Sequence, residues 1–342
     1  MQKVVHAYPT LAAGPSNCAR LYLRRAKSHY HPGTPRLQDA PHVHEPILRS
    51  NDMGQHQSAA RDLVRTLART VAILAAVLCV GCASTPEFGV RVEAGTVYAR
   101  NGGDQQTADI FVPQGSGPFP AIVLIHGGGW RKGGSWQMDH IANRLAEQGF
   151  VVANINYRLA PKFPYPAALV DVESAVRWLR EHADQYRCDP TRIGAWGYSA
   201  GAHLALLTAT RNQPVSPGST ATRIQAVVGG GTPADMLLFG DNEIVRSFMG
   251  GPPSARTDAY RDASPVTHVS ADDPPTFLYH GKQDWIVDPK HTHALADKLR
   301  AAGVEVEVIE PFFGHIAVFL FGRAEETAGL EFLRQHLRPP AP

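Results

Sequence analysis

A serine between small neighbours is the first candidate for chemistry in this sequence. Ser199 lies in Gly-Tyr-Ser-Ala-Gly, residues 197–201, after the strand-like run 192–196 and before the helix-like run 202–210. One interpretation is a tight turn into which only small residues fit. The other is a nucleophile that small neighbours expose where a strand turns sharply into a helix. The motif leaves both interpretations open, and the partners that a serine nucleophile needs decide between them.

A serine hydroxyl is a strong nucleophile only when an imidazole takes its proton, a carboxylate orients the imidazole and N–H donors hold the oxyanion. The donors are expected in His-Gly-Gly-Gly-Trp, residues 126–130. Glycine lacks Cβ, so its N–H group can approach a substrate oxygen closely. We therefore expect Gly128 and Gly129 to donate, together with Ala200, the residue after the serine. His126 is interpreted as a residue that holds this loop.

The base is expected among the histidines that follow Ser199. His315 lies in Pro-Phe-Phe-Gly-His, after the alternating run 304–310 and before a new apolar run. This segment is the last connection from a strand to a helix, and functional residues of parallel sheets lie in such loops. We expect His315 to be the base.

The other histidines of this half have different interpretations. His203 lies four residues after the serine, one turn along the same helix, which excludes it as the base. His280 ends a strand before a glycine and is expected to help hold that turn. His291 and His293 lie on or before a helix and are interpreted as surface residues.

The acid is expected in the segment 280–289, which offers two aspartates. Asp284 lies just past the end of a strand, close to the carboxyl edge of the predicted sheet. Asp288 precedes a proline and is interpreted as a cap of the following helix. We therefore expect Asp284 to orient His315, and Asp235, one strand earlier, is the reserve candidate.

Strands that alternate with helices must position these residues. The predicted strands are 95–100, 108–113, 121–126, 151–157, 192–199, 224–230, 275–281 and 304–310. The predicted helices are 140–150, 167–186, 200–210, 291–303 and 325–337. This alternation predicts an α/β fold in which a mostly parallel sheet has helices on both faces. The first two strands are expected to form an antiparallel hairpin at its N-terminal edge.

One stretch departs from the alternation. Residues 236–275 are rich in Gly and Pro and are predicted to form a short cap insertion over the sheet. Trp130 and Tyr198 are expected to contact the substrate, and the insertion together with Trp130 would wall the acyl or alcohol part. Because the insertion is too short for a full lid domain, large acyl chains are expected to be poor substrates.

Several segments together resemble the hormone-sensitive-lipase-like and bacterial feruloyl- or acetyl-esterase-like branches of the α/β-hydrolases. The segments are HGGGW at 126–130, NYRLAP at 156–161, FPYPAALVD at 163–171, GYSAGAHLA at 197–205 and HGKQDWIV at 280–287. The order serine, acid, histidine is also that of these enzymes. The resemblance covers roughly residues 90–338 and implies an α/β-hydrolase domain at 93–342.

The resemblance implies a serine carboxylesterase without a cofactor that acts on small-molecule esters. It leaves open short-chain acyl esters, acetyl or feruloyl esters of carbohydrates, and the amide bond of arylformamides. A binding protein of the same fold without catalysis is a further alternative, and it would have a broken triad or a blocked oxyanion loop. Arg158 and Asp171 are interpreted as a structural ion pair.

The N-terminal segment has the layout of an export signal. Within 53–81, three arginines precede the short apolar run 71–80, and small residues surround Cys82. This pattern predicts a signal peptide of the bacterial lipoprotein type, lipidation of Cys82 and a tether at 82–92. The alternative is a secretory signal without a lipid. Residues 1–52 show no apolar periodicity and are interpreted as disordered or as an upstream extension of a chain that starts at Met53.

Charge and motif content exclude other classes of function. The formal net charge is only +2, so the sequence does not indicate nucleic-acid binding. There is no His-Glu-x-x-His motif, and a zinc hydrolase is not supported. We expect no metal site, and membrane contact through the lipid anchor alone, at a bacterial outer membrane and facing the periplasm or the exterior.

Overall fold

The structure is a computed structural model that describes residues 86–211 and 222–338. The extension 1–52, the signal segment 53–81, Cys82 and the start of the tether lie outside the described residues. Among the helices in the described ranges, none is long and apolar enough to cross a membrane.

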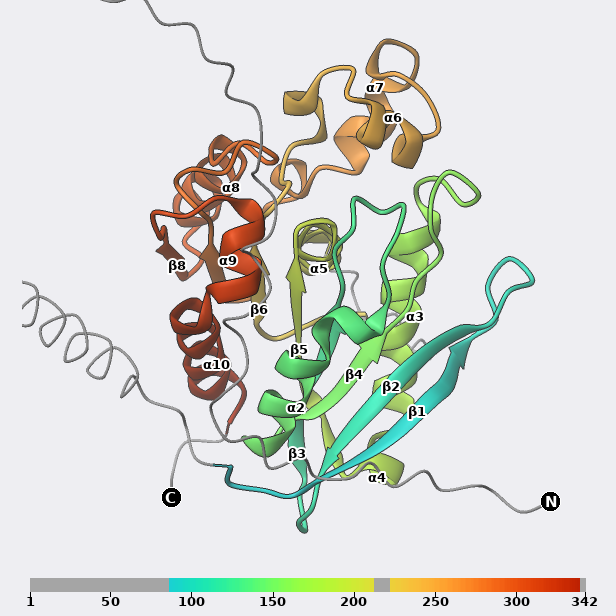
Figure 1. Ribbon diagram of the computed structural model, residues 1–342, viewed down its shortest axis with the longest axis vertical. Helices are drawn as coiled ribbons and strands as arrows, with labels where there is room; N and C mark the ends of the chain where they lie inside the picture. Colours follow the sequence, from blue (N-terminus) through green and yellow to red (C-terminus); the bar gives the residue numbers. More distant parts are fainter. Residues whose placement is uncertain (1–85, 212–221, 339–342) are drawn as a thin grey trace, which may run out of the picture. The chain divides into compact units, whose positions relative to one another are not determined.

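Within the described residues, the strands form one sheet in the order β1-β2-β4-β3-β5-β6-β7-β8. Their bounds are β1 Val90–Ala99, β2 Gln106–Pro113, β3 Phe119–Ile125, β4 Val151–Ile155, β5 Cys188–Tyr198, β6 Val227–Gly230, β7 Thr276–Tyr279 and β8 Val306–Ile309. The pairs β1–β2 and β2–β4 are antiparallel, and the pairs from β4 through β8 are parallel. The mostly parallel sheet with an N-terminal edge hairpin is therefore confirmed (Figure 1).

Helices connect the strands. The α-helices are α2 Asp139–Glu147, α3 Ala167–Glu181, α4 Ala183–Tyr186, α5 Ala200–Arg211, α6 Glu243–Met249, α7 Pro253–Asp262, α8 Lys290–Ala301, α9 His315–Phe321 and α10 Arg323–Leu337. Three single-turn 3₁₀ segments are η1 Ser135–Met138, η2 Met236–Phe239 and η3 Pro265–Thr267. Helix α9 is an addition to the predicted elements, because its seven residues are too few for a clear periodic pattern.

The residues of β3 show that helices cover both faces of the sheet. Alternate residues of this strand point to opposite faces, so Val123 belongs to the buried cluster that contains residues of α3 and α5, whereas Leu124 belongs to the cluster that contains residues of α2 and α10. All seven residues of β3 are buried, as expected for a strand covered on both faces.

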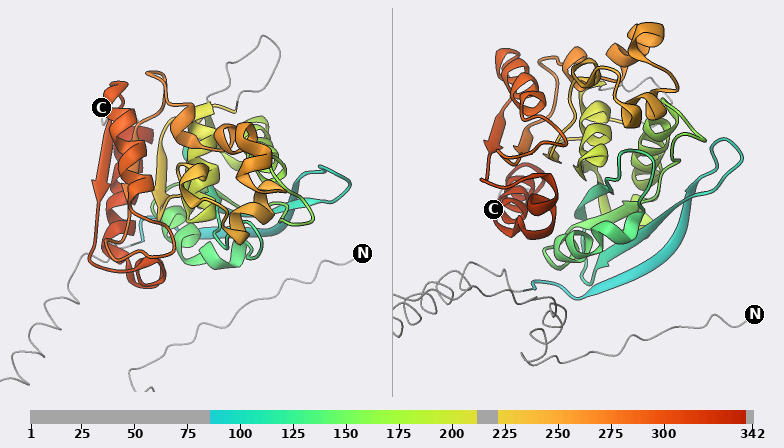
Figure 2. Two further views of the ribbon diagram at one scale, coloured as in Figure 1. Left: turned by 90° about the horizontal axis from the view of Figure 1, so that it is seen from above. Right: turned by 45° about the horizontal axis from the view of Figure 1, so that its top comes forward.

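The cap insertion predicted at 236–275 contains η2, α6, α7 and η3. In Figure 1 its helices α6 and α7 lie above α5, on the side where the parallel strands end, and the turned views agree (Figure 2). Tyr165 connects the cap to the body, because its N–H donates to Phe248 O at 2.7 Å and its hydroxyl donates to Asp262 Oδ2 at 2.5 Å.

Candidate active site

The turn around Ser199 explains the small residues of its motif. Ser199 has a left-handed backbone with φ of 54° and follows the last residue of β5. A Cβ on Gly197 would lie 2.2 Å from the carbonyl carbon of Gly201, and a Cβ on Gly201 would lie 2.1 Å from Ile125 O. Only glycine fits at these two positions, because the start of α5 crosses directly against β3 and β5. The strand-to-helix turn holds Ser199 in a strained conformation of the kind found at functional sites.

The structure brings the three residues of the expected triad together. His315 Nε2 lies 2.9 Å from Ser199 Oγ, and His315 Nδ1 lies 2.5 Å from Asp284 Oδ2. The hydroxyl of Tyr198 donates to the carbonyl oxygen of His315 at 2.6 Å and so fixes the backbone that carries the imidazole. These side chains come from three loops at the carboxyl ends of β5, β7 and β8, the edge at which parallel sheets bind ligands.

The carboxylate of Asp284 is fully occupied by donors. Its Oδ1 accepts the backbone N–H groups of Ile286 and Val287, both at 2.9 Å. Its Oδ2 also lies 3.1 Å from His280 Nε2. Burial alone raises the pKa of the Asp284 carboxyl, but the hydrogen bonds from His280 and His315 outweigh burial and hold that pKa well below its usual range. Asp284 is therefore ionised at neutral pH.

The other two aspartates that the sequence offered are caps. Asp288 Oδ1 accepts the backbone N–H of Lys290 at 3.0 Å, at the start of α8, which is the capping role expected for it. Asp235 Oδ1 accepts the N–H of Leu237 at 3.0 Å and caps η2. Neither carboxylate contacts His315.

The loop 126–130 leaves two N–H groups free beside the serine. Gly128 and Gly129 have φ of 102° and 61°, and a Cβ on Gly128 would lie 1.9 Å from Lys132 O. Among the described residues, no acceptor bonds to the N–H of Gly128 or Gly129. Ala200 is the first residue of α5, where N–H groups have no partner within the helix. The three expected donors thus lie in backbone that is available to a ligand.

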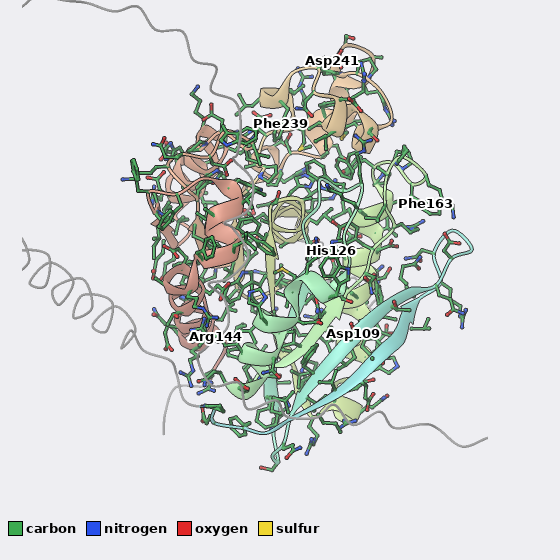
Figure 3. All side chains as sticks on the ribbon, viewed as in Figure 1. Asp109, His126, Arg144, Phe163, Phe239 and Asp241 are labelled. Carbon is green, nitrogen blue, oxygen red and sulfur yellow. The ribbon has the colours of Figure 1, made fainter. Side chains whose placement is uncertain are left out.

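His126 lies in the interior of the molecule (Figure 3) and contacts this loop. Its ring stacks on Tyr157 with centroids 4.3 Å apart, and its Nδ1 lies 2.8 Å from Gly127 O. The Tyr157 hydroxyl donates to the carbonyl oxygens of His126 and Gly127 at 3.1 and 3.3 Å. Burial lowers the pKa of His126 to about 4, so its ring is neutral near pH 7. These contacts agree with a structural role.

Two expected substrate contacts are corrected by burial. Trp130 is only 3% exposed, its ring stacks on Phe248 of the cap, and its N–H donates to His203 Nδ1 at 3.1 Å. Tyr198 is also buried, and its hydroxyl is occupied by His315. Both rings form part of the interior that supports the site, because each polar atom has found a buried partner.

The interpretation of His291 as a surface residue is wrong. The side chain is buried, and its Nδ1 accepts the backbone N–H groups of Ala234 and Asp235 at 3.3 and 3.2 Å. It thereby ties α8 to the start of the cap. His293, on the neighbouring face of α8, is half-exposed and lies 2.7 Å from Glu310 Oε1, as a surface residue would.

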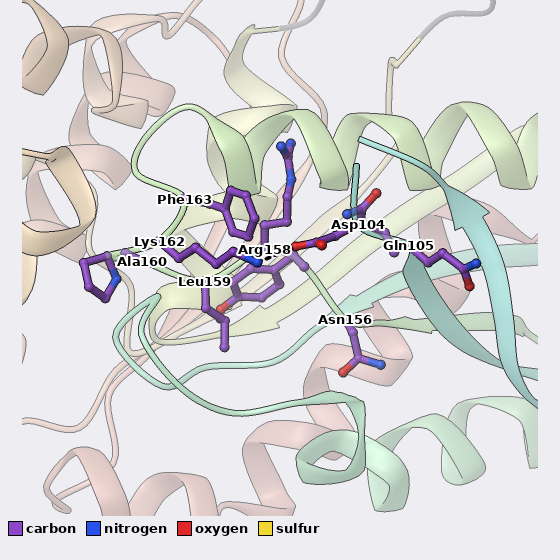
Figure 4. Close-up of a pocket in the computed structure, with 11 residues that line it drawn as sticks. Asp104, Gln105, Asn156, Arg158, Leu159, Ala160, Lys162 and Phe163 are labelled. Carbon is purple, nitrogen blue, oxygen red and sulfur yellow. Dashed lines mark hydrogen bonds and ion pairs between the residues drawn. The ribbon is translucent and has the colours of Figure 1, made fainter. Parts of the chain in front are cut away.

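Arg158 and Asp171 form the expected ion pair. Arg158 Nη2 lies 2.9 Å from Asp171 Oδ1, and the Asp171 side chain is fully buried. The residues around Arg158 line a cavity of about 650 Å³ between the hairpin turn 104–106 and the loop 156–163 (Figure 4). Because Tyr157 lines this cavity and also bonds to Gly127, the cavity lies behind the glycine loop, and Ser199 is not part of its wall.

No group of three or more His, Cys, Asp or Glu side chains in the described ranges is arranged to hold a metal ion.

The family model described as BD-FAE matches residues 108–299. The chain belongs to the BD-FAE family. Its fold is that of the α/β-hydrolases, as the sequence motifs implied.

Relatives of this BD-FAE chain include two proteins of Mycobacterium tuberculosis. The probable carboxylic ester hydrolase LipM is 36% identical over 229 residues, which cover 62% of this chain and 53% of LipM. The carboxylesterase NlhH is 31% identical, with 64% of this chain and 74% of NlhH covered. The chain spans about half the length of LipM and of the esterases LipC and LipQ from the same organism.

Solved structures show the same fold. A truncated carbohydrate esterase from gut microbiota has a TM-score of 0.66 at 24% identity, covering 75% of this chain and 99% of that chain. Esterase 2 of Thermogutta terrifontis with propionate bound has a TM-score of 0.61 at 25% identity, covering 75% and 97%.

Proposed function

We propose that this protein is a carboxylic ester hydrolase in which Ser199 is the nucleophile, His315 the general base and acid, and Asp284 the residue that orients His315. The observation that carries the proposal is the continuous chain from Asp284 through His315 to Ser199, at 2.5 and 2.9 Å. Structural histidines also bond to carboxylates, but a strained serine at the other ring nitrogen is the arrangement that nucleophilic catalysis requires.

The chemistry follows in two halves. Ser199 Oγ attacks the ester carbonyl carbon while His315 Nε2 takes the hydroxyl proton, and the N–H groups of Gly128, Gly129 and Ala200 stabilise the oxyanion. The tetrahedral intermediate expels the alcohol, whose oxygen takes the proton from His315. Water then attacks the acyl-serine with His315 again as the base, which releases the carboxylic acid and restores Ser199.

We propose short-chain acyl esters as substrates. The related Thermogutta terrifontis esterase 2 has been solved with propionate and with butyrate bound, which supports a small acyl group. The alcohol part is proposed to be a carbohydrate hydroxyl, because the structural neighbours include a carbohydrate esterase and a bifunctional protein named GH43-CE.

The test is labelling of the serine combined with turnover. Thermogutta terrifontis esterase 2 has been solved phosphorylated by paraoxon. We expect paraoxon to inactivate this protein with one phosphoryl adduct on the peptide that contains Ser199. The Ser199→Ala variant should lose at least about 10⁴-fold in kcat on 4-nitrophenyl acetate and take no adduct. Wild-type activity that needs a metal, or an adduct on another residue, would refute the serine mechanism.

Export and lipid anchoring at Cys82 are part of the proposal and are supported by the order of basic, apolar and small residues in 53–84. We expect the chain expressed from Met53 in a Gram-negative host to incorporate labelled palmitate and to fractionate with membranes. The Cys82→Ser variant should lose the label. A secreted product without the label would support the ordinary signal instead.

A further inference from the structure

The contacts of the active site continue beyond Asp284 to a second imidazole. His280, the residue after β7, places its Nε2 3.1 Å from Asp284 Oδ2, the same oxygen that His315 Nδ1 approaches. On its other side, His280 Nδ1 lies 2.6 Å from the Thr292 hydroxyl of α8. The side chains of His280 and Asp284 are both fully buried. Five side chains therefore connect α8 to the nucleophile without a break.

The neighbours of His280 determine which nitrogen carries its proton. Its Nε2 faces Asp284 Oδ2 and, at 2.9 Å, the carbonyl oxygen of Val287, and both are acceptors only. Nε2 therefore carries a proton. Its Nδ1 faces the Thr292 hydroxyl, which can donate a hydrogen bond to it. The hydrogen bond of this N–H goes to Val287 O, and the same edge of the imidazole lies 3.1 Å from the Asp284 oxygen that His315 uses.

The result is a carboxylate with no freedom to turn. Two backbone N–H groups hold Asp284 Oδ1, the His315 N–H holds Oδ2, and the N–H edge of His280 lies 3.1 Å from Oδ2. A hydrogen bond to a charged acceptor is stronger than one between neutral groups. The positive N–H edge of His280 attracts Oδ2 electrostatically and withdraws part of its negative charge from His315.

We infer that His280 is a positioning residue of the catalytic machinery, which holds Asp284 for His315 and sets how strongly His315 binds its proton. This inference rests on the proposed function. A role limited to the turn would need only the bond to Val287 O, and it would change stability without changing the pH dependence of catalysis.

The other titratable groups near His280 interact with a further histidine, His291. His291 on α8 interacts electrostatically with His280, Asp284, Asp235 and Asp288. Burial lowers the pKa of His291 to about 4, so this neighbour is uncharged near neutral pH. Asp284 is then the charged group that acts most directly on His280.

The test compares two amides at position 280. In His280→Gln the amide nitrogen can occupy the place of Nε2 beside Val287 O and Asp284, whereas His280→Asn is too short to do so. We expect kcat on 4-nitrophenyl acetate to stay near the wild-type value in His280→Gln. In His280→Asn it should fall roughly 10–100-fold, the size of loss seen when the hydrogen-bond partner of a metal-binding side chain is removed, with little change in KM. The acidic limb of kcat/KM should also move to higher pH in His280→Asn, because more of the Asp284 charge then acts on His315.

His293→Asn is the matched control, because this surface histidine of α8 pairs with Glu310 and not with Asp284. Thermal melts of all variants separate a loss of folding from a loss of rate. Thr292→Val provides a second approach, since it frees Nδ1 without touching Asp284, and it should shift the acidic limb in the same direction by a smaller amount. An Asn variant with wild-type kcat and pH profile, or one changed only in thermal stability, would overturn the inference.

A spectroscopic readout keeps the inference separate from the proposed function. The short hydrogen bond between His315 Nδ1 and Asp284 should give a proton NMR resonance far downfield, observable without substrate and also in Ser199→Ala. His280→Asn should shift this resonance, and His280→Gln and His293→Asn should leave it nearly in place. A protein that shows this response but hydrolyses no ester would contradict the function and not the positioning role. A resonance with the same chemical shift in the wild type and in His280→Asn would contradict the positioning role alone.

Discussion

Replacing Asp284 by asparagine keeps the shape of the side chain and removes its charge. Four N–H donors face this carboxylate: those of Ile286 and Val287 at Oδ1, and those of His280 and His315 at Oδ2. An asparagine amide offers one oxygen and one NH₂ group, so one pair of donors must then face another donor. The amide cannot satisfy both sides in either orientation.

Both orientations have a calculable cost. If the NH₂ group faces His315, Nδ1 must become the acceptor and Nε2 carries the proton, so Nε2 no longer accepts the Ser199 hydroxyl proton. Such a change of tautomer costs about 10⁴-fold in kcat in a serine protease, which is about 5.5 kcal/mol of transition-state stabilisation at 1.36 kcal/mol per tenfold. If the NH₂ group faces the backbone, the loop 284–287 loses two hydrogen bonds to a charged group, each worth roughly 1.5–3 kcal/mol.

We expect the first orientation to dominate kinetics, with kcat of Asp284→Asn on 4-nitrophenyl acetate reduced about 10⁴-fold. The matched control is Asp288→Asn, which removes a charge but keeps a capping oxygen at the exposed start of α8, and it should leave kcat unchanged. Steady-state kinetics and thermal melts of both variants give the answer. Equal losses of kcat in the two variants would show that the acid is misassigned, and near-wild-type kcat in Asp284→Asn would refute the triad.

Three further predictions concern stability. Gly201→Ala should destabilise the fold by about 1–3 kcal/mol or more in chemical denaturation, because its Cβ would lie 2.1 Å from a backbone oxygen of β3; an unchanged midpoint would contradict that packing. Asp171→Ala should cost roughly 3–5 kcal/mol in the same assay by leaving its arginine partner unpaired, and a loss under about 1 kcal/mol would argue against the buried pair. Burial lowers the pKa of His126, His203 and His291 from 6.5 to about 4, so the unfolded chain binds protons at these residues at a higher pH than the folded chain does. The melting temperature should therefore fall as the pH drops from 6.5 to about 4. A constant melting temperature over this pH range would contradict the prediction.

Periodicity located the strands and helices that form the scaffold, since each pattern reports which faces of an element are buried. The predicted strand 121–126 matches β3, Phe119–Ile125, and the predicted helix 291–303 matches α8, Lys290–Ala301. The helices of the cap were missed. Residues 236–275 contain only short helices broken by Gly and Pro, and segments of that length carry too few turns for a periodic signal.

The sequence by itself determined the candidates Ser199, Asp284 and His315, because each stands just past a strand and parallel strands end at one edge. The small residues of the serine motif also indicated a sharp strand-to-helix turn, and the structure then showed that a Cβ has no room at 197 and 201. Only the tertiary structure decided the partners of the buried polar atoms. Trp130, expected at the substrate, donates to His203, and His280, expected to hold a turn, bonds to Asp284. The physical reason is that periodicity reports local burial, whereas a buried donor finds its acceptor on whichever distant segment the folded chain packs against it.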